Sequence, residues 1–391
     1  MGLDKYYRKH IIRIILIVLC FLLIYPLQHF SFFHHQKGIF YTENDSTVSI
    51  TVIFAGDAMV HSTQYKSAYI DSLDAYNFNP VFQYIKPLLA ESDLNIVNLE
   101  TTLGDRPFSG FPNFSSPDAF AYALKLAGFN YFALANNHSV DKGKNGIIRT
   151  LDVLNEYEIK STGTYRDSAD RTSRYPEIIE INNIKTSLLN YTYGTNGIEV
   201  PEPIIVNLID TTQISSDIKE ARLRGAEVVM VYFHWGNEYE RTPNVHQKRI
   251  AEYTFLKGAD IIIGSHPHVV QPVELFEYEQ DSITYKKWVA WSLGNFVSNQ
   301  RDKYTDGGIM IKFKIKKNIY NQNISITDMT YIPTWVHRPQ NPTRYFILPI
   351  SASVPNDSLS ALNTNEKNDL LFISKAIRSQ INRDSLPIFE W

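Results

Sequence analysis

The stretch VSITVIFAGDAMVH, residues 48–61, decides the fold class of this chain. Residues 48–55 are rich in β-branched and aromatic side chains, which is typical of a buried β-strand. The strand pattern ends at Gly56 and Asp57 follows at once, so a carboxylate emerges beside a residue that has no side chain to crowd it. A polar group directly after a buried strand is typical of α/β folds, which bind ligands at strand ends.

The same pattern recurs along the chain. Helices are predicted between Ser116, which can cap a first turn that contains Pro117, and Gly128, and again over residues 245–257. Further strands are predicted at residues 94–98, 129–135, 228–233, 261–264 and 288–293. This alternation predicts an α/β fold with a largely buried and mostly parallel sheet.

Polar residues that can bind a ligand follow each of the six predicted strands. They are Asp57 and His61, Asn98 and Glu100, Asn136, Asn137 and His138, His234, His266 and His268, and Asn295. Taken singly, such an Asp usually caps a helix and such a His is usually structural. The carboxyl ends of parallel strands share one edge of a sheet, so together these residues predict a common metal or catalytic site.

The residue types suit a divalent metal, which is held by imidazole nitrogens, carboxylate oxygens and sometimes an amide oxygen. His266 and His268 flank Pro267, which restricts the turn and helps to present both rings. Asn137 offers a neutral oxygen, and His138 can stay off the metal as a proton donor. The chain has no Gly-x-x-x-x-Gly-Lys sequence, so a phosphate-binding loop of that kind is not indicated.

The N-terminus predicts a membrane anchor. Residues 1–10 are basic and residues 11–27 are apolar apart from Arg13, which is roughly the length that spans a bilayer. We therefore expect a transmembrane helix over 11–30, with residues 1–10 in the cytoplasm and everything after a linker at 31–47 outside the cell membrane. A cleaved signal peptide is the competing interpretation, but the segment has no small-x-small cleavage site.

Composition excludes several other classes. The 38 Lys and Arg nearly balance the 41 Asp and Glu, and no basic block follows the N-terminus, so nucleic acid is not an expected partner. The one cysteine, Cys20, rules out a disulfide within the chain. The C-terminal tail, residues 351–391, has apolar residues at helical spacing over 364–381.

In their order, these motifs resemble the bacterial poly-γ-glutamate capsule-synthesis (CapA-type) family, which belongs to the calcineurin-like metallophosphoesterase superfamily. The resemblance covers a domain at residues 48–350. The matching segments are GDAM at 56–59, NLE at 98–100, ANNH at 135–138, HWG at 234–236, GSHPHVVQPVE at 264–274, SLGNF at 292–296, YIPTWV at 331–336, and 344–350.

The resemblance implies a four-layer α/β/β/α sandwich with two divalent metal ions, Mn, Zn or Fe, at the strand ends. Glu100 would bridge the ions in a role that an Asp usually fills, and His138 would be the proton donor. Asn98 and Asn136 would contact metal or substrate. The metal ligands it implies are Asp57, Glu100, Asn137, His234, His266 and His268.

One position departs from the superfamily pattern. An Asp-x-His sequence is common there, but Met59 stands two residues after Asp57 and is a poor ligand for a hard ion. His61 either replaces the missing imidazole or lines the substrate cleft.

The sequence alone is compatible with two functions. The first is a hydrolase acting on a phosphoester or on an anionic surface polymer such as poly-γ-glutamate, or its precursor. The second is a non-catalytic subunit that assists assembly or export by a membrane polymer synthase. Either function would have the surface polymer and membrane synthase subunits as partners.

Overall fold

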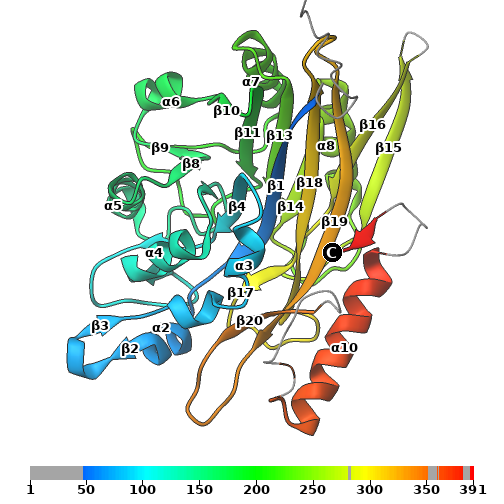
Figure 1. The fold of residues 1–391 in the computed structure, drawn as a ribbon. Helices are drawn as coiled ribbons and strands as arrows, with labels where there is room; N and C mark the ends of the chain where they lie inside the picture. The colour runs from blue at the N-terminus through cyan, green and yellow to red at the C-terminus, as the bar shows by residue number, and fades with distance from the viewer. Residues whose placement is uncertain (1–46, 281–282, 351–358, 360, 382–387) are drawn as a thin grey trace, which may run out of the picture. The chain divides into compact units, whose positions relative to one another are not determined.

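The strand predicted at residues 48–55 is β1 (Thr47–Ala58), which lies within a nine-stranded sheet (Figure 1). The computed structural model describes residues 47–280, 283–350, 359, 361–381 and 388–391. β1 pairs in parallel with β4 and antiparallel with β18, so one half of the sheet is parallel and the other antiparallel. The spatial order is β20 (Phe346–Pro349), β19 (Ile324–His337), β18 (Gly307–Asn318), β1, β4 (Leu94–Leu99), β7 (Tyr131–Ala133) and β8 (Lys160–Thr162), with β17 (Asn295–Val297) beside β1 and β21 (Phe389–Glu390) beside β19.

A second sheet has six strands, of which the central four are parallel. Its order is β10 (Ile179–Ile181), β11 (Ile184–Thr192), β13 (Val228–His234), β14 (Ile261–Ser265), β16 (Ile283–Ala290) and β15 (Val273–Gln280). The six predicted strands therefore belong to two sheets and not to one. β1, β4 and β7 lie in the first sheet, whereas β13, β14 and β16 lie in the second.

The helices have the ends that their sequences predict, within one or two residues. Gly128, with φ of 124°, terminates α4, and Pro117 is its N-cap, one residue later than the predicted cap. Asn244 caps α8 through a capping box with Gln247. The helices are α2 (Ser62–Ala68), α3 (Lys86–Leu89), α4 (Asp118–Ala127), α5 (Gly143–Glu156), α6 (Ser168–Arg174), α7 (Thr211–Leu223), α8 (Val245–Leu256) and α10 (Thr364–Ile381), with 3-10 turns η2 (Asp71–Leu73) and η3 (Asn79–Phe82).

Short strand pairs complete the described structure. They are β2 (Tyr69–Ile70) with β3 (Ala75–Tyr76), β5 (Thr102–Leu103) with β6 (Ser115–Ser116), and β9 (Thr164–Tyr165) with β12 (Ile205–Val206).

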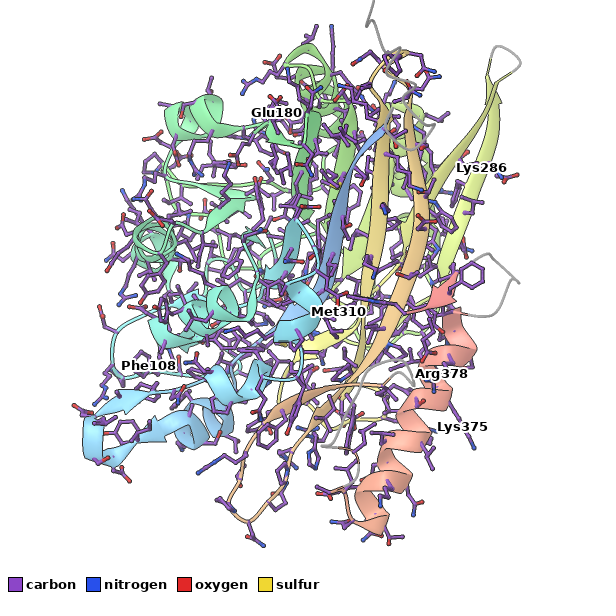
Figure 2. The ribbon with its side chains drawn as sticks, in the orientation of Figure 1. Phe108, Glu180, Lys286, Met310, Lys375 and Arg378 are labelled. Carbon is purple, nitrogen blue, oxygen red and sulfur yellow. The ribbon has the colours of Figure 1, made fainter. Side chains whose placement is uncertain are left out.

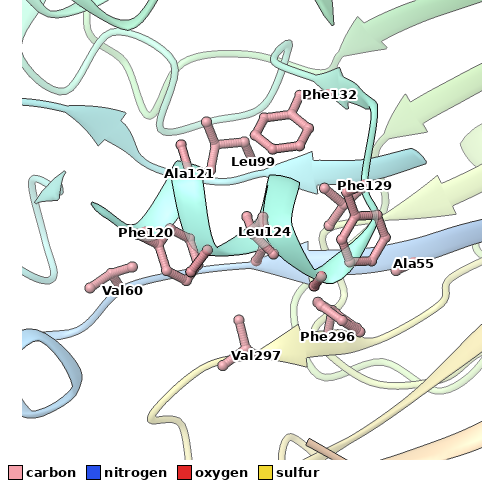
Figure 3. Close-up of a cluster of buried hydrophobic side chains, with 14 of the residues drawn as sticks. Ala55, Val60, Leu99, Phe120, Ala121, Leu124, Phe129, Phe132, Phe296 and Val297 are labelled. Carbon is pink, nitrogen blue, oxygen red and sulfur yellow. The ribbon is translucent and has the colours of Figure 1, made fainter. Parts of the chain in front are cut away.

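Three apolar cores arrange these elements in four layers. Between the two sheets, Val52 and Phe54 of β1 pack in one cluster with Met230 of β13. On the outer face of the first sheet, α4 and α5 cover the strands, and Phe120 and Leu124 are buried there (Figure 3). α7 and α8 cover the outer face of the second sheet. The order of layers is therefore α/β/β/α, as the resemblance implies, and burial on both faces explains the continuous apolar runs of the strands.

The C-terminal helix α10 has the bounds predicted from its periodicity and packs beside β18 and β19. Ile373, Ile377 and Ile381 are buried in the core between the sheets. Arg378 lies on this helix (Figure 2). Its guanidinium donates to the carboxylate of Glu390 in β21, which links the end of the chain to the helix. The tail is thus part of the folded unit formed by Thr47–Trp391.

The predicted anchor at 11–30, the cytoplasmic segment 1–10 and the linker up to residue 46 lie outside the described residues. Within the described part of the chain, no helix combines the length and the apolar character needed to cross a membrane.

Gly56 is required by a close backbone approach at the end of β1. A Cβ atom placed on Gly56 would lie 1.9 Å from the carbonyl oxygen of Gly294. We expect Gly56→Ala to destabilise the fold by about 1–3 kcal/mol, because the neighbouring backbone would have to move. Urea unfolding measures this, with Gly194→Ala as the control, since a Cβ at Gly194 would have nothing within 4 Å. Equal unfolding midpoints for the two variants would contradict the prediction.

Candidate metal centre

The polar residues at the predicted strand ends meet at one edge of the two sheets. Asp57, near the end of β1, pairs in register with Asn295, the first residue of β17, and with Asn98 of β4. In the second sheet, His234 at the end of β13 is level with Ser265 at the end of β14. The side chains are at most 4% exposed for each of Asp57, Glu100, Asn137, His138, His234, His266 and His268.

Asp57 and His268 contact each other directly in this cluster. Nδ1 of His268 lies 3.1 Å from Oδ2 of Asp57, and the backbone N–H of His266 donates to the same oxygen at 3.2 Å. Burial alone would raise the pKa of Asp57, but the hydrogen bond and charge of His268 outweigh it and hold the pKa below its usual value. Asp57 is therefore an anion that is already positioned for a cation.

Glu100 is a buried carboxylate of the cluster that lacks hydrogen bonds. Both of its carboxylate oxygens are buried and have no hydrogen-bond partner. Oε1 lies 3.6 Å from Nε2 of His234 and 3.9 Å from Nε2 of His268. Burial first, and then the negative charge of Asp57, raise the pKa of Glu100 well above its usual value. A buried carboxylate without partners is costly, so this position calls for a cation between the two imidazoles.

Glu100 also forms a ligand group with His234 and His266, and Asn137 contacts His234. Nε2 of His234 lies 2.8 Å from Oδ1 of Asn137, and Nδ1 lies 3.0 Å from the Ser265 hydroxyl. Nδ1 of His266 is buried and has no partner. Burial lowers the pKa of His266 to about 3, and it also lowers that of His234. Both rings are thus neutral near pH 7, which is the form that binds metal.

The ligand atoms gather in three overlapping groups, each within 4.8 Å, among the described residues. Glu100 belongs to two of them, and His266 and His268 also belong to two each. The groups are Asp57, Glu100 and His268; Glu100, His234 and His266; and Glu238, His266 and His268. A shared carboxylate between two ligand sets is the arrangement that holds two adjacent divalent ions, so the residues fit a two-metal centre.

His138 lies beside the cluster and is held by a different partner. Its Nδ1 lies 2.8 Å from Oδ2 of Asp141, and the Phe114 ring packs edge-on against the imidazole at 4.6 Å. Because the Asp141 carboxylate can only accept, Nδ1 donates and Nε2 is the nitrogen left for a substrate. Asp141 is thus the residue that orients His138, and it was absent from the sequence prediction.

Asn98 and Asn136 connect the cluster through hydrogen bonds. Asn98 donates to Oδ1 of Asp57 at 2.7 Å and accepts from Nδ2 of Asn136 at 3.1 Å. Oδ1 of Asn136 accepts from the backbone N–H of His138. In this structure both amides link protein groups to one another.

His61 is turned toward α2, where it is the N-cap residue. Its Nδ1 lies 3.2 Å from Oε1 of Gln64 and accepts from the backbone N–H of Asn299 at 3.3 Å. Its ring packs against Phe114, whose other neighbour is His138. No metal-ligand group found in the described part of the chain contains His61.

The turn that carries the paired histidines has an unusual backbone. His266 has φ of 96° and His268 has φ of 57°, values that non-glycine residues adopt rarely. Such strain persists only where the surroundings impose it, and it is common at functional sites. Pro267, expected to restrict this turn, lies between the two strained residues.

Two tyrosines flank the cluster on its solvent side. The Tyr193 ring lies 4.5 Å from that of His266, and the Tyr239 ring lies 6.3 Å from that of His268. Both are about half exposed, at 45% and 46%. Trp235 and Trp291, in contrast, are buried and pack on each other in the core outside the second sheet.

Comparison with known proteins agrees with the motifs. The model of the family "Bacterial capsule synthesis protein PGA_cap" matches residues 51–300. "Capsule biosynthesis protein CapA" of Bacillus anthracis is 28% identical over 257 residues, 63% of this chain and 60% of that protein. "PGA biosynthesis protein CapA" of Bacillus subtilis (strain 168) is 27% identical over 297 residues, 71% of this chain and 70% of that protein. The chain thus matches well under the full length of both relatives.

Solved structures show a more distant similarity. A phosphatase from Mycoplasma pneumoniae aligns with a TM-score of 0.39 and 16% identity, covering 73% of this chain and 94% of the other. A putative 5'-nucleotidase from Staphylococcus aureus aligns with a TM-score of 0.44 and 14% identity, covering 85% and 58%. The family match, in contrast, covers most of the folded unit and contains every residue of the cluster. The chain belongs to the bacterial capsule synthesis protein family PGA_cap.

Proposed function

We propose that this chain acts in the biosynthesis of an anionic capsule polymer, of the poly-γ-glutamate type, as a hydrolase with two divalent metal ions. The observation that carries the proposal is Glu100, whose two carboxylate oxygens are buried without a partner between His234 and His268. A protein that needed no cation would gain stability by replacing this group.

The residues divide between the two ions around Glu100. Asp57, Glu100 and His268 would hold one ion, and Glu100, Asn137, His234 and His266 would hold the other. Mn, Zn and Fe all suit a set of imidazole and carboxylate ligands. When bound, the two ions neutralise the negative charge that develops on the oxygens of a hydrolysed phosphoester or similar polymer bond.

His138 is proposed to supply the proton that the leaving group needs. Asp141 fixes the ring through Nδ1, and the Phe114 ring restricts its rotation. In the doubly protonated imidazolium, Nε2–H is then aimed away from Asp141, and this proton passes to the leaving oxygen while the ring returns to its neutral form. Tyr193 and Tyr239 would contact the polymer at the mouth of the site, and burial raises the pKa of both to about 12, so both stay uncharged.

The localisation proposed is the cell membrane. Residues 11–30 would anchor the chain, with residues 1–10 in the cytoplasm and the folded unit outside, where the surface polymer is made. The support is the length of the apolar run and the basic residues that precede it. Fractionated cells should retain the chain in the membrane pellet after a carbonate wash, and its release into the wash would contradict the anchor.

The metal and hydrolase proposals are tested on the purified full-length chain in detergent. We expect about two Mn²⁺ per chain by calorimetry and cleavage of bis-p-nitrophenyl phosphate. Asp57→Ala should lower both the metal content and the rate, the rate by about a hundredfold or more, because it removes a ligand from the first ion. Asp71→Ala, a change at an exposed acid outside the cluster, is the control. A wild-type chain that binds no metal would contradict both the metal-centre and the hydrolase proposals.

The alternative proposal is a non-catalytic subunit of a membrane polymer synthase. Met59, where a metal-binding imidazole is usual, favours it, because a centre with one ligand fewer can bind without turnover. A strain that carries Asp57→Ala distinguishes the two. Normal surface polymer in that strain, together with its loss when residues 48–350 are deleted, would support the subunit and contradict the hydrolase.

A further inference from the structure

Glu238 is an exposed acid that reaches the buried cluster from the solvent side. It lies in the loop after β13, and its carboxylate Oε1 is 4.0 Å from Nε2 of His268. It forms a metal-ligand group with His266 and His268, whose rings are almost fully buried. Nδ1 of His266 has no partner, so this group contains a nitrogen that is available to a cation.

The loop that carries Glu238 is fixed on both sides. Gly236 has φ of 90°, and a Cβ there would lie 2.8 Å from the Gln247 side chain. Tyr239 has φ of 66°, and its backbone N–H donates to the carbonyl of Pro267 at 2.8 Å. The loop is therefore bonded to the turn between His266 and His268, and the approach of Glu238 to His268 follows from this backbone geometry.

His268 Nε2 lies between two carboxylates. It is 3.9 Å from Oε1 of Glu100 on the buried side and 4.0 Å from Oε1 of Glu238 on the exposed side. Nε2 of His268 therefore faces one carboxylate on each side, and His268 is the residue that the two ligand groups Asp57, Glu100, His268 and Glu238, His266, His268 share. The ion held by Asp57, Glu100 and His268 also lacks a fourth protein ligand, because Met59 occupies the position of the usual imidazole.

We infer that Glu238 is a ligand of the metal ion held by Asp57, Glu100 and His268, in place of the imidazole that Met59 does not provide. The inference rests on the proposed metal centre. A carboxylate adds a negative charge that an imidazole would not, so the ligand set of the two ions carries the charges of Asp57, Glu100 and Glu238. Glu238 is the most exposed of these ligands, because its side chain is 42% exposed whereas those of Asp57, Glu100 and His268 are buried.

The test is Glu238→Gln in the full-length chain in detergent, with calorimetric titration by Mn²⁺ alone. We expect two ions in the wild type, and in the variant one of the two to bind on the order of tenfold more weakly or worse. Glu240→Gln is the matched control, because Glu240 is equally exposed two residues further on and belongs to no metal-ligand group among the described residues.

Thermal unfolding provides the second measurement. Without metal, Glu238→Gln should melt like the wild type, because Glu238 is exposed, whereas the rise in melting temperature on adding Mn²⁺ should be smaller. Equal Mn²⁺ affinities for wild type and Glu238→Gln would overturn the inference alone, as would equal weakening in Glu240→Gln. A wild type that binds no Mn²⁺ would overturn the metal centre itself.

Discussion

Replacement of Glu100 by glutamine should abolish metal binding at the proposed two-metal centre and yet stabilise the metal-free protein. Glu100 belongs to both ligand sets, so its loss removes a ligand from each ion. In the absence of metal its carboxylate is buried and unpaired, beside the negative charge of Asp57. Glutamine has nearly the same shape and keeps a polar group in this place but removes the charge, so the metal-free fold should gain on the order of 1 kcal/mol or more at neutral pH, about 1.4 kcal/mol for each unit by which the pKa of Glu100 is raised.

The gain should depend on pH. The folded-state pKa of Glu100 lies well above 4.5, so the folded protein keeps this proton to a higher pH than the unfolded chain does. The metal-free wild type therefore loses stability as pH rises from about 4.5 toward the folded pKa. Glu100→Gln cannot titrate and escapes this loss, so the difference between the two proteins should widen with rising pH.

Chemical unfolding in EDTA over pH 5 to 8 measures this effect, and Mn²⁺ calorimetry measures the loss of binding. The control is Glu180→Gln, at an exposed glutamate of β10 outside the cluster, which should change neither quantity. A variant that is less stable than wild type without metal would show that Glu100 has a partner in the fold.

Replacement of His138 by asparagine should remove the proposed hydrolase activity and leave the proposed metal binding intact. His138 lies outside the ligand groups of the described residues, and its ring is oriented by Asp141. The loss of a general acid lowers kcat by about 10²–10⁴. The loss should be greatest for an alkyl phosphodiester, whose leaving oxygen needs a proton, and smaller for a p-nitrophenyl ester, whose leaving group departs as the anion.

The decisive measurement is the ratio of the two rates in wild type and His138→Asn, with Mn²⁺ content determined on the same samples. His246→Asn, at an exposed histidine of α8, is the control and should behave as wild type. If both esters slow equally, His138 does not protonate the leaving group. If Mn²⁺ is lost, its role lies in the metal centre.

Much of the fold follows from local pattern. β1, β4, β13 and β14 begin within a residue of the predicted positions, and α10 has the predicted bounds. The division of the strands between two sheets did not follow from local pattern, because a parallel strand buried on both faces has the same composition in either sheet. The long strand β18 was not predicted, although Ile311, Phe313 and Ile315 alternate in it with more exposed lysines.

The candidate site was predictable in its buried part and less so at its surface. Strand ends and family motifs indicated Asp57, Glu100 and the histidines, because polar groups after buried strands are conspicuous in sequence. Glu238 and Asp141 were missed. Glu238 looks like an ordinary loop acid, and only the backbone bond between Tyr239 and Pro267 brings it to His268. Asp141 lies three residues after His138, a spacing that could have suggested the pair.

Asp57 and His268 are 211 residues apart in the chain, yet their side chains meet. Such a contact closes a very long loop, and it forms only after the elements between them have found their places. A partly synthesised chain therefore has no complete set of the candidate ligands. The proposed metal ions would therefore bind only once folding has brought these distant residues together, and the metals available where folding finishes would decide which element the centre takes up.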